Sequence, residues 1–261
     1  MMDVHSLAGR RALVCGSTQG IGRAAAVELA SRGAAVTLFA RDAAALDRVR
    51  ADLPGDGHTF LVADFTDNDS VAAAAAAELR DRGAFHVLVN NTGGPPGGPI
   101  AEAPPGAFVE AFRAHLVNNH ILVQAVVPGM KEAGYGRIVN VVSTSVREPI
   151  AGLGVSNTVR AAVAGWSKTL SGELARFGIT VNNVLPGYTK TTRLDSIIGA
   201  RAKAGGKNVD DVARDMVAQV PAGRFAESWE IAAAIGFLAS PAAGYITGVS
   251  LPVDGGRIAA L

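Results

Sequence analysis

Short apolar segments alternate with helix-forming segments along the whole chain. The apolar segments are rich in Val, Leu and Ile and lack a polar residue at every second position, which is typical of parallel strands buried on both faces. Strands are expected at 12–15, 35–40, 59–63, 87–90, 137–142, 180–185 and 249–253. The alternation predicts an α/β fold, a Rossmann-type doubly wound parallel sheet of about seven strands in three αβα layers.

Length and composition narrow the class of protein. The chain has 261 residues, of which 49% are hydrophobic, and it contains no recognisable linker, so a single domain over 1–261 is expected. The formal net charge of +1 gives no reason to expect a nucleic acid or an anionic membrane surface as partner. The single cysteine, Cys15, excludes an internal disulfide and offers no metal cluster, so no metal site is expected.

No targeting or membrane segment is expected. Residues 1–9 contain no apolar core of the kind that a signal peptide needs. No run of residues approaches the roughly 18 apolar positions of a membrane span. The sequence therefore predicts a soluble, cytoplasmic protein without a membrane partner.

A glycine-rich turn after the first strand is the clearest binding motif. Residues 15–22, CGSTQGIG, open an alanine-rich helix that is expected over 21–31. Glycines at such a turn let the backbone approach phosphate groups, and free N–H groups at the start of the helix donate to them. Strand, turn and helix together predict a dinucleotide site, with a purely structural turn as the alternative.

Two segments interrupt the alternation of strands and helices. Residues 93–99, GGPPGGP, follow the fourth strand and are incompatible with helix or strand. Residues 192–222 form a helical, mixed-charge insertion after the sixth strand. Ligands of open α/β sheets bind at the carboxyl ends of the strands, so both segments are candidates to line the site, and 192–222 is interpreted as a substrate lid. A solvated loop and a solvated helix are the alternatives.

The end of the second strand bears on the choice of cofactor. NAD sites place an acidic residue near this point to hold the ribose hydroxyls, whereas an arginine accommodates the 2′-phosphate of NADP. The acidic position holds Ala40, and Arg41 follows it. Asp42 is interpreted as the N-cap of the next helix. The sequence therefore favours NADP(H) over NAD(H).

The glycine spacing, G-x-x-x-G-x-G, resembles that of the short-chain dehydrogenase/reductase family. Further matching motifs are Asp64, 90–93 (NNTG), 186–191 (PGYTKT), 244–248 (GYITG) and 253–256 (VDGG). The resemblance covers about residues 7–256 and points to members that are similar to ketoacyl-carrier-protein reductases. Together with Arg41, it implies a cofactor site made of Gly16, Ser17, Thr18, Gln19, Gly20, Ile21, Gly22, Arg41, Asp64, Asn90, Gly93, Arg160, Pro186, Gly187 and Thr191.

The resemblance fails at most of the catalytic residues. In this family a serine and a tyrosine polarise the substrate carbonyl, a lysine four residues after the tyrosine lowers its pKa, and an asparagine supports a proton-relay water. The serine is present as Ser143. The tyrosine and lysine positions hold Ser156 and Arg160, and the asparagine position holds His115. The downstream segment 170–175 fixes this register.

These replacements weaken acid catalysis. A tyrosine hydroxyl has a pKa of about 10, whereas a serine hydroxyl is a far weaker acid and too short to reach the same carbonyl. Arg160 keeps the positive charge, but its guanidinium does not release a proton. General acid catalysis contributes about 10²–10⁴-fold, so hydride transfer is expected to be slow unless another group helps. The candidates are His115, which has a usable pKa, then Tyr188, and the paired hydroxyls of Ser143 and Ser156, with ordinary packing as the alternative for each.

Positive charge bears on the substrate. Arg147, Arg160, Lys190 and Arg193 fall in segments that are expected to surround the catalytic crevice. Arginine makes bidentate contacts with carboxylates and phosphates, so an anionic small-molecule substrate is a hypothesis. Surface placement of Arg147 and Arg193 is the alternative.

Two functions remain open from the sequence. The first is an NADP(H)-dependent oxidoreductase that acts on a ketone or an alcohol with a non-standard catalytic site. Ser143, the lid-like segment and the cofactor motifs favour it. The second is a non-catalytic dinucleotide-binding sensor or scaffold, which the missing tyrosine and lysine favour. Turnover of a carbonyl that is abolished by Ser143→Ala would discriminate between them.

A homo-oligomer, a dimer or tetramer, is also expected. The predicted helix over 156–176 carries small residues suited to close helix approach, namely Ala161, Ala162, Ala164, Gly165, Ser167 and Gly172. The family resemblance implies that this helix and the one expected over 106–133 pair between subunits. Packing of the small residues against the sheet is the alternative.

Overall fold

The computed structural model describes residues 3–260, and its sheet has the predicted topology. The strands are β1 (Arg11–Cys15), β2 (Ala35–Ala40), β3 (Thr59–Val62), β4 (Val87–Asn90), β5 (Gly136–Val141), β6 (Ile179–Pro186) and β7 (Ser250–Val253). Neighbouring strands are parallel and follow the order β3-β2-β1-β4-β5-β6-β7, in which the chain crosses from β3 to β4 and reverses direction. The predicted fold class is confirmed, and each strand boundary lies within one residue of the expected one.

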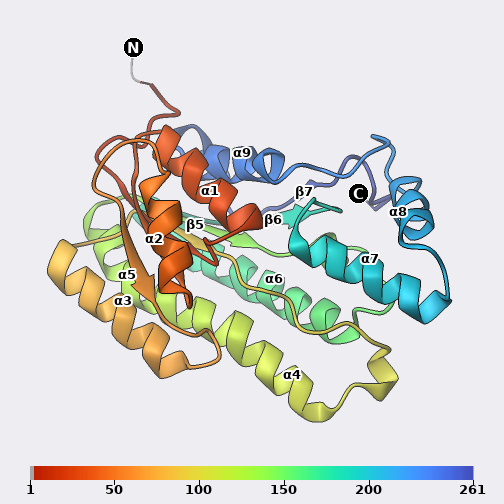
Figure 1. The fold of residues 1–261 in the computed structure, drawn as a ribbon. Helices are drawn as coiled ribbons and strands as arrows, with labels where there is room; N and C mark the ends of the chain where they lie inside the picture. The colour runs from red at the N-terminus through yellow and green to blue at the C-terminus, as the bar shows by residue number, and fades with distance from the viewer. Residues whose placement is uncertain (1–2, 261) are drawn as a thin grey trace.

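Helices cover both faces of the sheet (Figure 1). They are α1 (Gly20–Ser31), α2 (Ala43–Ala51), α3 (Asn68–Arg82), α4 (Pro105–Phe112), α5 (Asn118–Glu132), α6 (Gly154–Leu174), α7 (Thr192–Gly205), α8 (Val209–Val217) and α9 (Ser228–Ala239). One hydrophobic core joins α1, α2 and α9 to the sheet, and a second joins α3, α5 and α6 to the opposite face. Strand β1 contributes Val14 to the first core and Leu13 and Cys15 to the second, which explains its uninterrupted apolar sequence.

The helix expected over 106–133 is interrupted. Helix α4 ends at Phe112 and α5 begins at Asn118, and a π-helical turn, Arg113–Val117, joins them. Turns of this kind occur frequently at functional sites. His115, in the middle of the turn, is only 2% exposed.

The insertion after β6 consists of α7 and α8. These two helices share a small core of their own, which includes Leu194, Ile198, Val212 and Met216. The Thr191 hydroxyl accepts a hydrogen bond from the Leu194 N–H at 3.3 Å and so caps the start of α7. The N-terminus of α7 therefore lies at the carboxyl end of β6 (Figure 1).

Candidate active site

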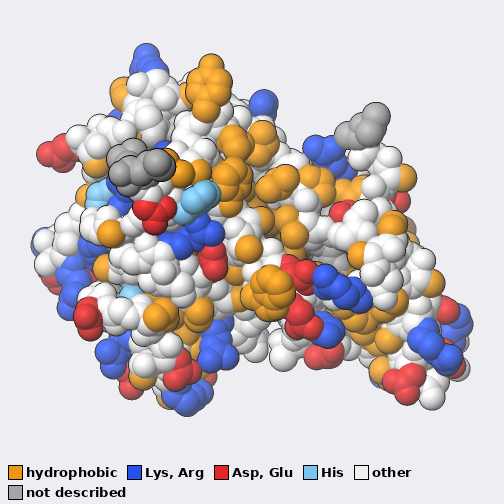
Figure 2. Space-filling view, turned by 90° about the horizontal axis from the view of Figure 1, so that it is seen from above, with side chains coloured by type: hydrophobic (Ala, Val, Ile, Leu, Met, Phe, Trp, Pro, Cys, Tyr) orange, Lys and Arg blue, Asp and Glu red, His pale blue; other side chains and the backbone are white. Residues whose placement is uncertain are grey.

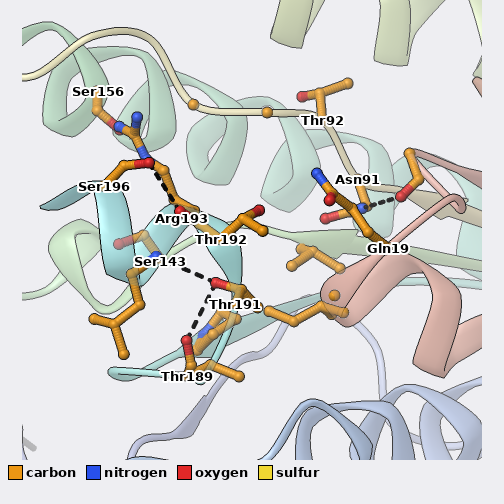
Figure 3. A pocket seen from close by; sticks show the side chains of 18 of the residues that line it. Gln19, Asn91, Thr92, Ser143, Ser156, Thr189, Thr191, Thr192, Arg193 and Ser196 are labelled. Atoms are coloured by element: carbon orange, nitrogen blue, oxygen red, sulfur yellow. Dashed lines mark hydrogen bonds between the residues drawn. The ribbon is translucent and has the colours of Figure 1, made fainter. Parts of the chain in front are cut away.

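A cleft of about 1000 Å³ lies at the carboxyl ends of the strands. Figure 3 shows Gln19 and Asn91 toward one side of the cleft and Ser156 and Ser196 toward the other. Most of the predicted site residues line it, namely Gly16, Thr18, Gln19, Gly20, Ile21, Arg41, Asp64, Gly93, Ser143, Ser156, Arg160, Pro186, Gly187 and Thr191. The glycine turn and the candidate catalytic residues therefore share one cavity.

The glycine turn depends on positions that accept no side chain. Gly16 and Gly20 have φ angles of 59° and 53°, in the left-handed region that favours glycine. A Cβ on Gly16 would lie 2.5 Å from the backbone oxygen of Asn91. The Asn91 amide in turn donates to the carbonyls of Cys15 and Gly16 at 3.3 and 3.2 Å. The Asn91 side chain thus fixes the turn against the loop after β4, a role for which the sequence gives no signal beyond the paired asparagines.

The start of α1 has unsatisfied backbone donors that face the cleft. Gln19 is the N-cap residue and makes no side-chain cap hydrogen bond, and the first turn contains no acidic residue. Gly20 and Ile21 line the cleft at this point. The N–H groups and the positive end of the helix dipole are therefore available to an anion, as the phosphates of a dinucleotide require.

Three of the predicted cofactor residues lie behind the lining instead of on it. The buried Ser17 hydroxyl accepts a hydrogen bond from the Phe39 N–H at 2.9 Å and so anchors the turn to β2. Gly22 is packed so closely that a Cβ would collide with the Gly16 carbonyl. Asn90 belongs to a ladder of polar side chains inside the sheet. These residues support the lining of the cleft without being part of it.

The polar ladder runs across four strands. Asn90 donates to the Asn140 oxygen at 2.8 Å, Asn140 donates to the Asn183 oxygen at 3.0 Å, and Asn183 donates to the Ser250 hydroxyl at 3.1 Å. The four residues are partners in the strand register. The ladder uses the Asn90 N–H donor inside the sheet, whereas the Asn90 Oδ1 is buried without a hydrogen-bond partner among residues 3–260.

Arginines gather at the end of the cleft near β2. Arg41 lines the cleft with Asp64, and hydrogen bonds from the Thr66 N–H and hydroxyl lower the pKa of the Asp64 carboxyl, with a smaller effect from Arg41. Asp42 accepts a hydrogen bond from the Ala45 N–H at 3.0 Å, which confirms it as the N-cap of α2. Arg48 of α2 also lines the cleft. The sequence marks this residue only as a basic side chain seven positions after Arg41.

At the other end of the cleft, two hydroxyls and one guanidinium line the wall. Ser143 follows β5, and Ser156 and Arg160 lie one turn apart on the same face of α6. Arg160 donates to the carbonyls of Val141 at 2.8 Å and Thr92 at 3.3 Å. Burial, with a smaller contribution from the charge of Arg193, lowers the pKa of Arg160 to about 10, so its guanidinium remains charged at neutral pH.

His115 does not meet the expectation of a usable pKa. Burial, aided by the charges of Arg160 and Arg193, lowers its pKa to about 2. Its Nδ1 lies 2.5 Å from the Thr92 hydroxyl, and Thr92 lines the cleft while His115 does not. His115 is therefore neutral at physiological pH and reaches the cleft only through Thr92. The sequence could not show this, because it does not reveal the burial of the histidine or the arginines around it.

Tyr188 lines the cleft, but its hydroxyl is engaged elsewhere. The Tyr188 hydroxyl donates to the Gln219 oxygen at 3.3 Å, and its ring packs edge-on against Phe225 at 6.1 Å between centroids. These contacts connect the loop after β6 to the segment that follows α8. They give Tyr188 a packing role in this arrangement.

Only two of the four cations expected around the catalytic end are found there. Arg160 and Arg193 line the cleft. The expectation was wrong for Lys190, which forms an ion pair with Glu227 at 2.5 Å, and for Arg147, which is exposed and donates to the Ser250 carbonyl. Both prefer partners outside the cleft. Arg201 of α7, which the sequence did not single out, also lines the cleft.

Residues 3–260 contain no cluster of three or more His, Cys, Asp or Glu side chains that is arranged to hold a metal ion. Nor is any helix in this part of the chain long and apolar enough to cross a membrane.

The chain is similar in sequence and structure to known reductases. A family model described as enoyl-(acyl carrier protein) reductase matches residues 16–257. The 3-oxoacyl-(acyl-carrier-protein) reductase of Haemophilus influenzae is 36% identical over 252 residues, which cover 95% of this chain and 98% of that protein. The crystal structure of L-sorbose reductase from Gluconobacter frateurii, complexed with NADPH and L-sorbose, superposes with a TM-score of 0.91 at 27% identity and covers 100% of both chains.

A further solved structure carries the name of the family itself. It is described as a short chain dehydrogenase/reductase family protein, and it superposes with a TM-score of 0.83 at 33% identity over 97% of this chain and 99% of that chain. The sheet order and the glycine turn at the start of α1 agree with these matches. The chain belongs to the short-chain dehydrogenase/reductase family.

Proposed function

We propose that the protein is an NADP(H)-dependent oxidoreductase that interconverts a ketone and an alcohol with a non-standard catalytic site. The observation that carries this proposal is the single cleft, which joins the glycine turn at one end to Ser143, Ser156 and Arg160 at the other. The sequence relative from Haemophilus influenzae is a 3-oxoacyl reductase, and the sorbose reductase was solved with NADPH. The first supports a reductase, and the second supports NADPH as its cofactor.

The residues present fit a dinucleotide. The turn over 16–22 and the uncapped start of α1 would hold the diphosphate, and Asp64 would contact the adenine. Arg41, with Arg48 beside it, would hold the 2′-phosphate, and Arg160 would donate to the nicotinamide ribose. NADPH, when bound, supplies the hydride.

The catalytic end can polarise a carbonyl without an acidic side chain. The Ser143 and Ser156 hydroxyls would donate hydrogen bonds to the carbonyl oxygen, and the Arg160 charge would stabilise the negative charge that develops on it. Because neither arginine nor serine releases a proton at neutral pH, the proton that the alcohol oxygen finally carries would come from water. We expect slower turnover than a tyrosine would allow.

One observation favours the alternative, a non-catalytic dinucleotide-binding sensor or scaffold. The pKa of His115 is lowered to about 2 and that of Arg160 to about 10, so neither side chain titrates near neutral pH. Efficient general acids and bases have pKa values near the working pH. A protein that only binds the nucleotide needs no such group.

The first test is a fluorescence titration with NADPH and, separately, NADH. We expect micromolar binding of NADPH and weaker binding of NADH, both lost in Gly16→Val because the side chain would clash with Asn91. Gly165→Ala, where the added Cβ meets nothing within 4 Å, is the matched control. If neither nucleotide binds the wild-type protein, both proposed functions fail.

The second test is a screen of carbonyl compounds that follows NADPH consumption. We expect Ser143→Ala to abolish turnover while leaving NADPH binding intact. The double variant Ser156→Tyr with Arg160→Lys should raise the rate, because it supplies a phenol and an ammonium at the positions that the family uses. NADPH binding without turnover of any carbonyl would support the sensor or scaffold.

Residues 192–222 would act as the substrate lid. The cleft-lining residues of this segment all come from α7, namely Thr192, Arg193, Leu194, Ser196, Ile197 and Arg201. The core that α7 shares with α8 is separate from the two cores of the sheet, so the pair can shift without disturbing them. Such a segment suits the control of access to the cleft.

We further infer that the chain assembles into a homo-oligomer. Gly165 and Gly172 are exposed on α6, seven residues apart, and an added Cβ would meet nothing within 4 Å. Hydrophobic side chains also gather on the face of the molecule seen in Figure 2, and Trp229 of α9 is 66% exposed. Light scattering should give a multiple of 26.6 kDa, reduced by Gly165→Arg if α6 forms the interface.

A further inference from the structure

Two arginines at the catalytic end of the cleft have no acidic partner among residues 3–260. Arg160 donates to the carbonyls of Val141 and Thr92, and Arg193 donates to the carbonyl of Pro95 at 2.6 Å. Neither takes part in any of the ion pairs found within residues 3–260. A guanidinium has five N–H donors, so these carbonyls leave several donors free and both charges unbalanced.

The two guanidinium groups converge on one loop. Arg160 comes from α6 and Arg193 from the start of α7, and their partners, Thr92 and Pro95, lie three residues apart after β4. Burial and then the charge of Arg193 lower the pKa of Arg160, and burial followed by both arginine charges lowers that of His115. The catalytic end therefore holds two neighbouring positive charges.

Among the described residues that line the cleft, no other group balances these charges. The acidic residues that line the cleft are Asp42 and Asp64, which lie at the end near Arg41. His115 is neutral at physiological pH and adds no charge of either sign. Partly buried, unpaired cations cost free energy in the free protein. An anion that enters between the guanidinium groups recovers this cost on binding.

We propose that Arg160 and Arg193 form a subsite for a carboxylate of the substrate, which is therefore an oxo acid or the corresponding hydroxy acid. The proposal rests on the proposed function, because it places the carboxylate beside the Ser143 and Ser156 hydroxyls that would polarise the ketone. A carboxylate matches the planar fork of a guanidinium and accepts two parallel hydrogen bonds from it. The substrate would thus be oriented by its charge and reduced at a carbonyl a short distance away.

The diphosphate of the cofactor is the second possible source of the anion. Its expected place is the uncapped start of α1, which Gln19 marks at the opposite side of the cleft from Ser156 (Figure 3). The two sources predict different results for Arg193→Gln. If the arginine holds a substrate carboxylate, this variant keeps its affinity for NADPH.

The test compares oxo acids with their methyl esters. Pyruvate, 4-oxopentanoate and 3-benzoylpropanoate, each beside its ester, are titrated by calorimetry into the wild-type protein, with and without saturating NADPH. We expect at least one acid to bind about ten-fold more tightly than its ester, since charge-assisted hydrogen bonds are worth this much or more. Arg160→Gln and Arg193→Gln should each reduce the preference to less than about three-fold. Arg147→Gln, which changes an exposed arginine outside the cleft, should retain it.

Three results would overturn the proposal. The first is equal binding of every acid and its ester to the wild-type protein. The second is a preference for the acid that survives in both variants. The third is an Arg193→Gln protein that loses NADPH affinity about ten-fold and keeps the preference, which would give the anion site to the cofactor. An arginine-dependent preference without any NADPH consumption would support the subsite and refute the proposed oxidoreductase activity.

Discussion

The two ends of the parallel sheet differ in how they balance partly buried positive charge. At the amino ends of the strands, Arg11 forms an ion pair with Glu78 at 2.5 Å, and Glu78 also accepts hydrogen bonds from the hydroxyls of Thr37 and Thr59 at 3.2 Å. At the carboxyl ends, the hydrogen-bond partners of Arg160 within the described part of the chain are carbonyl groups. The first arrangement is complete within the protein, whereas the second leaves donors and charge for a ligand.

Arg137 shows that the absence of an acidic partner does not by itself create a site. It is 4% exposed and pairs with no carboxylate in the described chain, but it donates to the carbonyls of Gly136, Gly178 and Ser240. Its guanidinium also lies 4.0 Å from the centre of the Tyr135 ring. Its donors and its charge are thus well used inside the protein. Arg160 and Arg193 differ because they line a cavity with free donors.

Substitutions at the two ends should have unequal effects on stability. Glu78→Ala leaves Arg11 unpaired, so the free energy of unfolding should fall by about 3 kcal/mol. Arg160→Met removes a charge that no acidic residue of the described chain balances, so the same quantity should change by less than about 1 kcal/mol or rise. Urea denaturation followed by circular dichroism measures both values.

NADPH affinity should separate the same two variants in the reverse order, so that Arg160→Met is the one that weakens binding. Glu78 does not line the cleft, and Glu78→Ala should leave NADPH affinity unchanged at a temperature where the protein is folded. A fall of about 3 kcal/mol in the free energy of unfolding of Arg160→Met would contradict the comparison. It would show that the charge of Arg160 is already balanced in the free protein.

The fold was predictable because burial on both faces leaves a direct trace in the sequence. Uninterrupted apolar segments such as 87–89 are typical of strands covered on both sides, and the residues between them have the length and composition of helices. Interactions between residues close in the sequence were also predictable, as the N-cap hydrogen bond of Asp42 at the start of α2 demonstrates. These features depend on neighbours in the chain.

The charges of the site were less predictable because they depend on distant partners. Lys190 belongs to a segment that enters the cleft, but Glu227 draws its ammonium group away. The neutral state of His115 follows from its burial and from Arg160 and Arg193, which come from α6 and α7. The spacing of these residues in the sequence does not predict where their side chains lie in the fold.

The buried histidine at the catalytic end should make the protein sensitive to acid. The pKa of His115 is about 2 in the folded protein against 6.5 for an unperturbed histidine, so between these values only the unfolded state binds the proton. Stability from this group is complete above pH 6.5 and is lost as the pH falls below it. At pH 5 the loss amounts to about 2 kcal/mol.

His115→Asn should remove this contribution. Between pH 7 and pH 5, its free energy of unfolding should fall by about 2 kcal/mol less than that of the wild-type protein. His5→Asn, at an exposed position, serves as the control and should follow the wild type. Equal slopes for wild type and His115→Asn would show that the histidine is protonated in the folded protein, and the catalytic end would then carry a third positive charge.

The variant Arg41→Ala tests whether the arginines at the end of the cleft near β2 also bind an anion. Arg41→Ala should weaken NADPH binding about ten-fold and leave NADH binding unchanged, because only NADPH carries the 2′-phosphate. Arg50→Ala is a matched control, since Arg50 lies on the neighbouring helix α2 but forms an ion pair with Asp47.

The ten-fold difference should shrink as salt is added, because Arg41 is exposed and its charge is screened. If Arg41→Ala weakened both nucleotides equally, the arginine would act on a part that they share, and the preference for NADPH would have to come from Arg48 or from the shape of the cleft.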